Sequence, residues 1–385
     1  MEELEPYLSF FNISQFGYGA IVLWVFAAGL VLFLFYYLFF FSRLLWYKPG
    51  TVAVQPDPVS VIIASRNDAE MLRLHLPIIM KQKDIEFEVI VVDDCSVDDT
   101  VDVLREYEAK YPNFRRSKLV ENGEFEGGKK YAVTIGIKAA KYPKLVFIDA
   151  DCYPVSDQWL RKMAEGLMYK KIILGYGPYK REKGLLNKFI RFDTYKIAIQ
   201  YLTYALAGFP YMGIGRNLAY QSFLYFGAKG FTSHLNVVSG DDDLFVNEVA
   251  TSKNTGIEIE PETHVYSISK DTYSKWEYQK RRHLTTAPKY KIGHKILLVL
   301  FPLSQYILNI SFVILLCLNY AFPVVIGLYA FKIFIQGIIQ FFGMKRLNVL
   351  DLFLWSFVLE LGLMFFYPWV TILNIVNEDQ RRRWI

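Results

Sequence analysis

The apolar residues of this chain form blocks of two lengths. The sequence contains no charged residue from Tyr18 to Phe41, and about 20 apolar residues suffice to span the hydrocarbon core of a bilayer. A second apolar region runs from Ile296 to Val376 with few charges. It predicts two to three further spans, near residues 296–318, 321–343 and 350–375. Residues 59–290 between these blocks have the composition of a soluble domain, so the pattern predicts one globular domain between membrane segments.

Within the middle region the apolar runs are short and end in polar residues. The runs Val59–Ser65, Phe87–Asp94 and Lys144–Asp151 show little alternation, which is typical of strands covered on both faces in a parallel sheet. Helical patterns at 68–82, 98–111 and 129–142 separate or follow them, the second with Asp98 or Ser96 as its N-cap. Strands that alternate with helices predict a doubly wound α/β domain.

Each predicted strand ends in polar residues, with the letters SRND, DDCS and DAD. Aspartate and serine are common turn formers and helix caps, which explains any one of these clusters. Three clusters at the same edge favour a binding site, because ligands of α/β sheets bind at the carboxyl ends of the strands.

Asp149 and Asp151 follow the third strand two residues apart. In extended backbone their side chains point to the same face, and two close carboxylates repel each other unless a cation or a proton lies between them. Oxygen ligands suit Mg²⁺ and Mn²⁺. We therefore predict a divalent metal site at Asp149 and Asp151.

A second acidic cluster, Asp241 to Asp243, precedes an apolar helical stretch. Acidic residues in a first helical turn are favoured by the helix dipole, but three in a row exceed what a cap needs. We predict that one of them faces the site as a general base.

Two basic segments are candidates for anion binding. Glu126–Lys130 opens a helix with two glycines and two lysines, and backbone amides at a helix start favour anions. Tyr278–Leu284 is basic and aromatic and precedes the second apolar region. It is either an anchor at the bilayer surface or a clamp for a diphosphate, for which arginine is suited; the two roles are compatible.

Charges around the first apolar run predict its orientation. Glu2, Glu3 and Glu5 precede it, and Arg43 and Lys48 follow it, so the positive-inside rule places the N-terminus outside and the middle domain in the cytoplasm. A cleaved signal peptide fits less well, because the start is acidic and the apolar run is long. The net charge of +5 suits contact with anionic membrane lipids. Scattered basic residues without a motif argue against nucleic acid.

The last apolar segment gives conflicting signals. Lys345 and Arg346 before it and the arginine-rich tail after it are both predicted to be cytoplasmic, which fails if the segment crosses fully. It is re-entrant or interfacial, or the rule fails here. Lys332 and Glu360 lie at membrane depth and either pair with each other, line a cavity or extend to an interface. Cys95, Cys152 and Cys317 lack metal-ligand spacing, and we interpret Cys152 as a small packing residue.

The order of motifs between residues 58 and 290 resembles the family 2 glycosyltransferases. Within them it is similar to the membrane-embedded processive type that includes cellulose, chitin and hyaluronan synthases. The segments that carry the resemblance are VSVIIASRNDAE, FEVIVVDDCSVDDT, GGKK, DAD, SGDDDLFVN, GIGRN and QKRRH. The resemblance implies a GT-A fold, which is a Rossmann-like mixed sheet with helices on both faces, here flanked by transmembrane helices.

The resemblance also implies a role for individual residues. Asp94 contacts the uridine with Asp93 beside it, Lys129 lies near the diphosphate, and Asp149 and Asp151 hold the metal, Mg²⁺ or Mn²⁺, and the nucleotide diphosphate. Asp242 takes the base position in one alignment and Asp241 in another. Gln279 and Arg282 match the Q-x-x-R-W motif near the nucleotide sugar. His283 stands where the family has tryptophan, which argues against processive synthesis.

The implied function is that of a membrane-bound, inverting glycosyltransferase. It moves a sugar from a nucleotide-sugar donor, a UDP-sugar, to a lipid-linked or glycan acceptor, as in cell-envelope polysaccharide synthesis. A polyprenyl-phosphate glycosyltransferase, a processive synthase, a nucleotidyltransferase and a non-enzymatic scaffold are the alternatives. The protein is expected to be a multi-pass membrane protein with a cytoplasmic catalytic domain, in the inner membrane if its source is a bacterium.

The expected division of the chain follows from these patterns. It comprises an extracytoplasmic segment 1–17, a transmembrane helix 18–41, a linker 42–57, a catalytic domain 58–274, an interfacial segment 275–294, a membrane region 295–376 and a basic tail 377–385.

Overall fold

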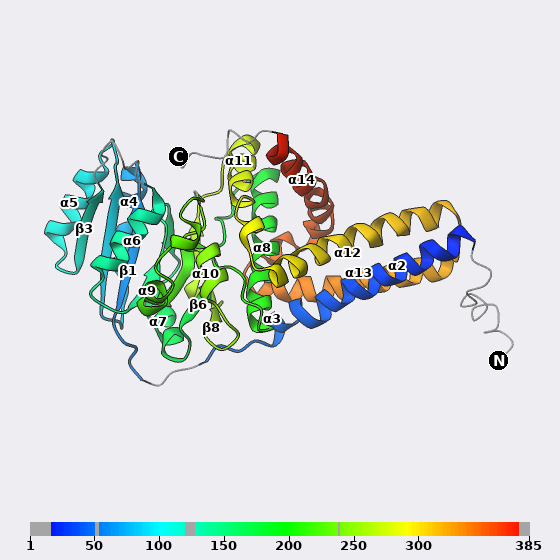
Figure 1. Cartoon of the computed structure of the whole chain (residues 1–385), viewed down its shortest axis with the longest axis horizontal. Helices are drawn as coiled ribbons and strands as arrows, with labels where there is room; N and C mark the ends of the chain where they lie inside the picture. Colours follow the sequence, from blue (N-terminus) through cyan, green and yellow to red (C-terminus); the bar gives the residue numbers. More distant parts are fainter. Residues whose placement is uncertain (1–16, 51–53, 120–127, 238, 377–385) are drawn as a thin grey trace.

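The computed structural model describes residues 17–50, 54–119, 128–237 and 239–376. Figure 1 shows an α/β domain at one end and long helices that extend away from it at the other. The acidic N-terminal residues and the basic tail 377–385, which entered the orientation argument, lie outside the described residues.

A seven-stranded mixed sheet forms the centre of the α/β domain, with the strand order β3-β2-β1-β4-β7-β6-β8. The strands are β1 (Val59–Ser65), β2 (Phe87–Asp94), β3 (Phe114–Leu119), β4 (Lys144–Phe147), β6 (Ile172–Gly175), β7 (Leu218–Gln221) and β8 (Thr255–Glu258). Strands β1 to β4 are parallel, and β7 runs antiparallel to both β4 and β6. The expected mixed sheet is confirmed. Strands β5 (Cys152–Pro154) and β9 (Val265–Ser267) form a separate antiparallel pair.

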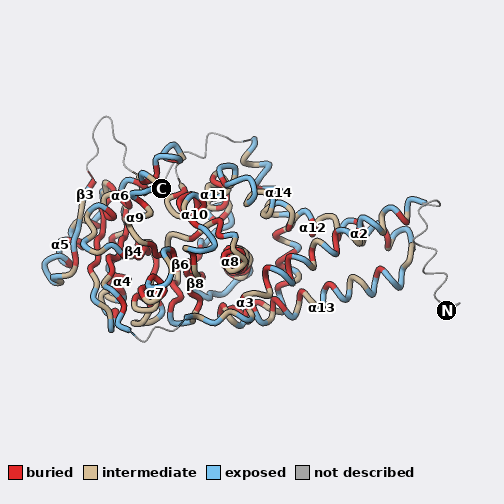
Figure 2. The backbone as a smooth tube through the Cα atoms, turned by 60° about the horizontal axis from the view of Figure 1, so that its bottom comes forward, coloured by how far each residue is buried: buried red, intermediate tan, exposed pale blue. Residues whose placement is uncertain are grey.

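Helices cover both faces of this sheet. They are α4 (Ala69–Ile79), α5 (Thr100–Lys110), α6 (Lys129–Ala139), α7 (Trp159–Tyr169), α9 (Ser222–Gly227) and α10 (Asp243–Val249). In β1, Val61 and Ile63 pack in one core with α4, α5 and α7, whereas Ile62 packs in another with α6. Each of these three side chains is at most 1% exposed. Burial on both faces explains why the strands read as continuous apolar runs, and Figure 2 shows the strands as mostly buried.

The third strand is shorter than its sequence predicts. Strand β4 ends at Phe147 rather than at Asp151. The last ladder bond joins Ile148 N to Ile62 O at 3.4 Å, and Cys152 N then donates to Asp149 O at 3.0 Å, which closes a turn. Asp149 and Asp151 therefore lie in a turn and not in extended backbone. The alternation of side chains along a strand, from which we expected both to point to the same face, does not apply to them.

The cap of α5 also differs from the prediction. Asp99, not Ser96 or Asp98, occupies the N-cap position. Asp98 instead accepts from Thr100 N at 3.0 Å and from Ala69 N at 3.1 Å. It thereby joins the starts of α4 and α5, a pairing that a local pattern cannot reveal.

Among the described residues, four helices are long and apolar enough to cross a membrane by length and composition. The first consists of α2 (Tyr18–Phe35), a π-helical segment η4 (Tyr36–Phe41) and α3 (Arg43–Trp46), so it runs beyond the predicted end at Phe41. The others are α12 (Ile292–Cys317), α13 (Phe322–Arg346), and η9 (Leu350–Trp355) with α14 (Ser356–Val376). The longer first helix has a physical reason, because α3 contacts α8 (Leu185–Leu206) and α13.

Helix α8 connects the α/β domain to the long helices. It contacts β8 on one side and η4, α3 and α14 on the other, and Figure 1 shows it between the sheet and the bundle. Arg191 of α8 donates two hydrogen bonds to the carboxylate of Asp351 in η9, at 2.8 and 2.7 Å. Helix α11 (Tyr273–His283) contacts α14, so two elements of the domain hold the last helix.

Residues of five elements meet at one carboxylate. Glu360 of α14 is 7% exposed. Its oxygens accept from Lys196 of α8 at 2.8 Å, and from three glutamines of α12 and α13, namely Gln305 at 2.7 Å, Gln340 at 3.0 Å and Gln336. Gln340 also donates to Tyr37 of η4 at 3.2 Å. The expected alternatives for Glu360, a pair with Lys332 or an interfacial position, are thus replaced by an ion pair with Lys196.

Replacing Glu360 by alanine should destabilise the protein, because it leaves the half-buried Lys196 ammonium without its carboxylate. Breaking a buried ion pair on one side destabilises by about 3–5 kcal/mol. Thermal unfolding of the purified protein in detergent measures the effect, with Glu360→Gln expected in between. Glu70→Ala, at an exposed position of α4, is the matched control and should unfold like the wild type. Equal melting temperatures for Glu360→Ala and the control would contradict this account.

Candidate active site

The predicted site residues come together at the carboxyl edge of β1 and β4. A pocket there is lined by Lys129, Asp149, Gly215, Asp241 and Asp242, with apolar side chains such as Ile62, Phe147 and Leu218 forming the rest of its wall. The edge is where the topology of an open α/β sheet leaves space for a ligand.

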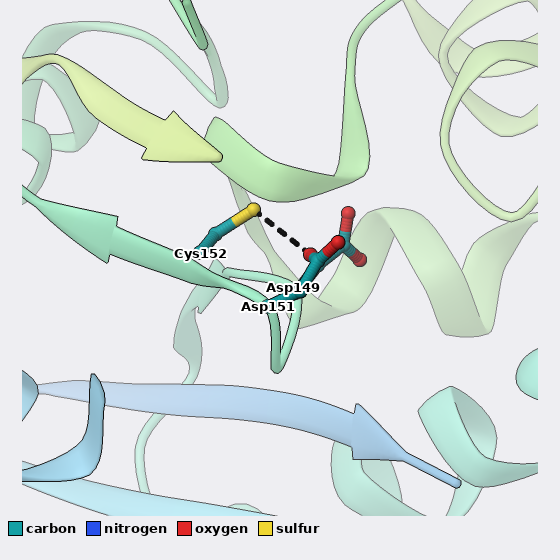
Figure 3. Close-up of side chains that lie close together, drawn as sticks. All are labelled: Asp149, Asp151 and Cys152. Atoms are coloured by element: carbon teal, nitrogen blue, oxygen red, sulfur yellow. Dashed lines mark hydrogen bonds between the residues drawn. The ribbon is translucent and has the colours of Figure 1, made fainter. Parts of the chain in front are cut away.

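The turn after β4 carries the predicted metal ligands. One ligand atom each of Asp149, Asp151 and Cys152 lies within 4.8 Å of the others, and Figure 3 shows the two carboxylates beside the thiol. Cys152 is 1% exposed and donates to Asp151 Oδ1 at 3.2 Å. Burial raises the pKa of the Cys152 thiol well above its usual value, which favours the neutral thiol of a packing residue over a nucleophile. His75, which sequence reasoning missed, contacts Ala150 O through Nδ1 at 3.1 Å and supports the turn.

Lys129 lies between two of the acidic groups. It is the first residue of α6, and its Nζ lies 2.8 Å from Asp149 Oδ1 and 3.3 Å from Asp241 Oδ2. Burial alone would lower the pKa of Lys129, but Asp149, Asp241 and Asp242 together raise it well above its usual value. Burial likewise opposes ionisation of Asp149, but Lys129 with Arg216 and Arg282 lowers the pKa of that carboxyl. Both groups are therefore charged at neutral pH.

The three consecutive aspartates have different surroundings. Asp242 is the N-cap of α10: its Oδ1 accepts from Asp243 N at 2.7 Å, and its Oδ2 accepts from Gly215 N at 2.6 Å. Burial, together with the charges of Asp241 and Asp243, raises the pKa of Asp242 to about 7. A carboxyl that titrates near neutral pH is suited to proton transfer.

Asp243 has a structural environment. It is 8% exposed, and its Oδ2 accepts from Tyr290 OH at 2.7 Å and from Thr286 Oγ1. These partners come from the segment between α11 and α12, so Asp243 joins the acidic edge to the start of the long apolar helix α12. This leaves Asp241 and Asp242 as the aspartates of this cluster that line the pocket.

The end of β2 lies beside the start of α6. Both oxygens of Asp94 lie 3.0 Å from Gly128 N, and Arg66 of the β1–α4 connection approaches Asp94 to 3.9 Å. Asp93 accepts from Ser96 N at 3.1 Å. Asp94 and Lys129 thus lie at the same helix start.

Helix α11 approaches the edge from the other side. Gln279 forms a hydrogen bond with Tyr179 OH at 3.3 Å, and among the described residues no hydrogen bond joins it to a predicted acidic group. Arg282 is half-buried and acts on Asp149 through its charge. Tyr179 was missed by sequence reasoning, because its position depends on a β-bridge to Ser267 far along the chain.

The site thus combines carboxylates with a lysine and arginines at the edge of the sheet of an α/β domain. Residues 60–217 match the family described as Glycosyl transferase family 2. The chain therefore contains a domain of this family, as its motifs predict.

Two curated relatives and one solved structure illustrate the likeness. The chondroitin synthase of Escherichia coli is 31% identical over 126 residues, which are 32% of this chain and 18% of that protein. The hyaluronan synthase of Pasteurella multocida is 29% identical over 142 residues, which are 35% of this chain and 14% of that protein. The chain thus spans less than a fifth of the length of these relatives.

The solved structure is the mannosyltransferase PcManGT from Pyrobaculum calidifontis in complex with GDP-Man and Mn²⁺. It is 19% identical, with a TM-score of 0.54 over 88% of this chain and 97% of that chain. This likeness supports the fold alone, and the GT-A fold that the motifs implied is confirmed.

Proposed function

We propose that this protein is a membrane-bound, inverting glycosyltransferase that takes a sugar from a nucleoside-diphosphate donor, a UDP-sugar. The observation that carries the proposal is the pairing of Asp149 with Lys129 beside Asp241 and Asp242, inside a family 2 glycosyltransferase domain. Carboxylates that hold a cation and a base beside a diphosphate are the groups that such a transfer requires.

The donor would lie across the ends of β1, β2 and β4. Asp93 and Asp94 would contact the nucleoside, and Lys129 and Arg282 would face the diphosphate. Gln279, fixed by Tyr179, would lie near the sugar. The structure of PcManGT, which has the same fold, contains the nucleotide sugar GDP-Man.

Asp149 and Asp151 fit a divalent cation, Mg²⁺ or Mn²⁺, because their donor atoms are hard carboxylate oxygens within 4.8 Å of each other. When bound, such a cation supplies neutralisation of the negative charge on the departing diphosphate. Cys152 is a poor ligand for these ions, since it is neutral and buried. The solved structure of PcManGT contains Mn²⁺.

In the transfer, Asp242 would accept the proton of an acceptor hydroxyl. The hydroxyl oxygen would form a bond to the anomeric carbon, while the bond from that carbon to the diphosphate oxygen breaks and its electron pair leaves with the diphosphate. Attack from the face opposite the leaving group inverts the configuration at that carbon. Lys129 and Arg282 would stabilise the charge that develops on the leaving oxygens.

The acceptor is proposed to be lipid-linked, with a glycan as the alternative. Arg281 of α11 donates to Asn374 Oδ1 at 3.1 Å and to Leu373 O at 3.2 Å, so the helix that carries Gln279 and Arg282 is held by the apolar helix α14. An acceptor that reaches the site from the bilayer surface would pass these helices. His283 in place of the family's tryptophan argues for one transfer rather than for a long polymer.

We also propose that α2 with α3, α12 and α13 cross the membrane and that α14 does not. Figure 1 shows the first three extending together, whereas α14 lies beside α8 and α11. Both ends of the last apolar segment are held at the domain: Asp351 by Arg191, and Asn374 by Arg281. One side of α14 is exposed and apolar at helical spacing, namely Val358, Leu361, Phe365, Trp369, Ile372 and Ile375. In the membrane interface this side would face lipid, and the conflict between Arg346 and the basic tail disappears.

Release of a nucleoside diphosphate by the purified full-length protein tests the proposed activity. The assay uses a panel of UDP- and GDP-sugars, Mn²⁺ or Mg²⁺ and a total lipid extract. We expect metal-dependent UDP release from one donor that is lost in Asp149→Asn, and a labelled sugar that moves with lipid. Release of pyrophosphate would point to a nucleotidyltransferase. No release from any donor by the folded protein would contradict the proposal.

The pH dependence of kcat/KM tests the base. Asp242 must be ionised to accept a proton, and its pKa is about 7. We expect the rate to fall about tenfold per pH unit below that value and to level off above it. Asp242→Asn should lose about 10²–10⁴ in rate and lose this limb of the profile. Asp241→Asn is the matched comparison and should keep this limb, shifted to lower pH, because the charge of Asp241 raises the pKa of Asp242. The reverse result would assign the base to Asp241.

Accessibility of the C-terminus tests the membrane arrangement. An epitope added after Ile385 should be cleaved by protease from the same side as the α/β domain, and one inserted at Asn319 between α12 and α13 from the opposite side. Protection of the C-terminal epitope on the domain side would mean that α14 crosses the membrane.

A further inference from the structure

One arginine near the acidic edge, Arg216, has not yet been assigned a function in donor binding or catalysis. Arg216 lies in η5 (Gly215–Asn217), in the segment GIGRN before β7. Its guanidinium lies over the ring of Tyr179, 4.6 Å from the centroid. Its Nε is buried and has no hydrogen-bond partner in the described part of the chain. A buried polar group without a partner is costly and calls for an explanation.

The backbone that carries Arg216 is fixed on both sides. Gly215 N donates to Asp242 Oδ2 at 2.6 Å. The side chain of Asn217, which is 0% exposed, accepts from Trp159 Nε1 at 3.0 Å and donates to Tyr176 O at 2.8 Å and to Thr263 O at 2.9 Å. Arg216 is thus held between two fully bonded neighbours, so its direction is set by the fold.

The opposite wall has glycines where these side chains need space. A Cβ on Gly177 would lie 2.5 Å from Arg216 Nε and 2.9 Å from its Cδ, and a Cβ on Gly175 would lie 2.3 Å from the amide carbon of Asn217. Contacts this short require something to move, since packed interiors leave no spare volume. Glycines at 175 and 177 therefore provide the space that the side chains of Asn217 and Arg216 occupy.

The charge of Arg216 acts on the predicted metal site. It helps to keep Asp149 ionised, yet among the described residues no carboxylate forms an ion pair with it. Tyr179, on which it stacks, is hydrogen-bonded to Gln279 of α11. Arg216 is thus held between the turn of Asp149 and the helix of Arg282. Its Nε lacks a hydrogen-bond partner in the described part of the chain, and a guanidinium suits an anion with two oxygens.

We propose that Arg216 binds the diphosphate of the donor, together with Arg282, and stabilises it as it leaves. This inference rests on the proposed function. As the bond between the anomeric carbon and the diphosphate oxygen breaks, the electron pair passes to that oxygen, and the guanidinium donates hydrogen bonds to the phosphate that gains the charge. The contact with the Tyr179 ring fixes the orientation of the guanidinium before the donor binds. Binding therefore costs little side-chain conformational entropy.

Binding of nucleotides to the full-length protein in detergent, measured by calorimetry with Mn²⁺, tests this role. The probes are UDP, GDP and the matching free nucleosides. We expect Arg216→Ala to weaken binding of the preferred nucleoside diphosphate by about tenfold to a hundredfold, the range of hydrogen bonds to charged groups. Binding of the free nucleoside should not change, and Arg216→Lys should recover part of the loss. Arg105→Ala on the exposed side of α5 is the control.

Gly177→Ala provides a second variant in which the arginine remains but its guanidinium must move. It should weaken diphosphate binding as Arg216→Ala does, at a melting temperature that shows a folded protein. If Arg216→Ala and Arg216→Lys bind the diphosphate like the wild type, the inference is wrong while the proposed function stands. Equal weakening of diphosphate and nucleoside would assign Arg216 a purely structural role. If the wild type binds no nucleoside diphosphate, the proposed function itself fails.

Discussion

Like-charge repulsion at one edge of the sheet is the constraint on which the rest of the structure depends. Asp149, Asp241, Asp242 and Asp243 converge there, and each is compensated in a different way. Lys129 lies within ion-pair distance of Asp149 and Asp241, backbone amides bond to Asp242, and two hydroxyl groups bond to Asp243. Crowded carboxylates cannot all ionise without such partners. The fold therefore brings a helix start, a loop and the segment that leads into α12 to the same place.

The compensation also connects the catalytic domain to the long helices. Thr286 and Tyr290 reach Asp243 from the segment that leads into α12, and Arg191 and Lys196 reach Asp351 and Glu360 from α8. These contacts join groups that are buried or half-buried, where breaking one partner is more costly than at the surface. The α/β domain is thus built as one unit with the helices rather than as a separate domain on a flexible linker.

The strands could be predicted from the sequence because their signal is local. The bounds of β1 and β2 agree with the apolar runs at 59–65 and 87–94, since a strand buried on both faces is marked by its own residues. Parallel topology also predicted that the polar ends of the strands meet at one edge, whereas the position of Lys129 near the diphosphate was implied only by the family resemblance. Four apolar segments agree with four helices for the same reason.

Several of the missed features depend on partners far along the chain. Glu360 bonds to Lys196, and Asn217 bonds to Trp159. Neither residue type nor spacing in the sequence identifies such a partner. The end of β4 was missed because Ile148, Asp149 and Ala150 continue the apolar and acidic pattern while the backbone already turns.

Gly175 and Gly177 are small because of residues far along the chain, and this reason becomes visible only in the structure. In the sequence they are two small residues at the end of a strand, which usually mark a bulge or a close approach of backbone. In the structure the close approach is made by side chains, those of Asn217 and Arg216. One of these is fully bonded and fixes the loop, whereas the other leaves a buried nitrogen unpaired. The two glycines thus leave space for two side chains with different functions. Asn217 stabilises the loop through its hydrogen bonds, whereas we propose that Arg216 binds the diphosphate of the donor.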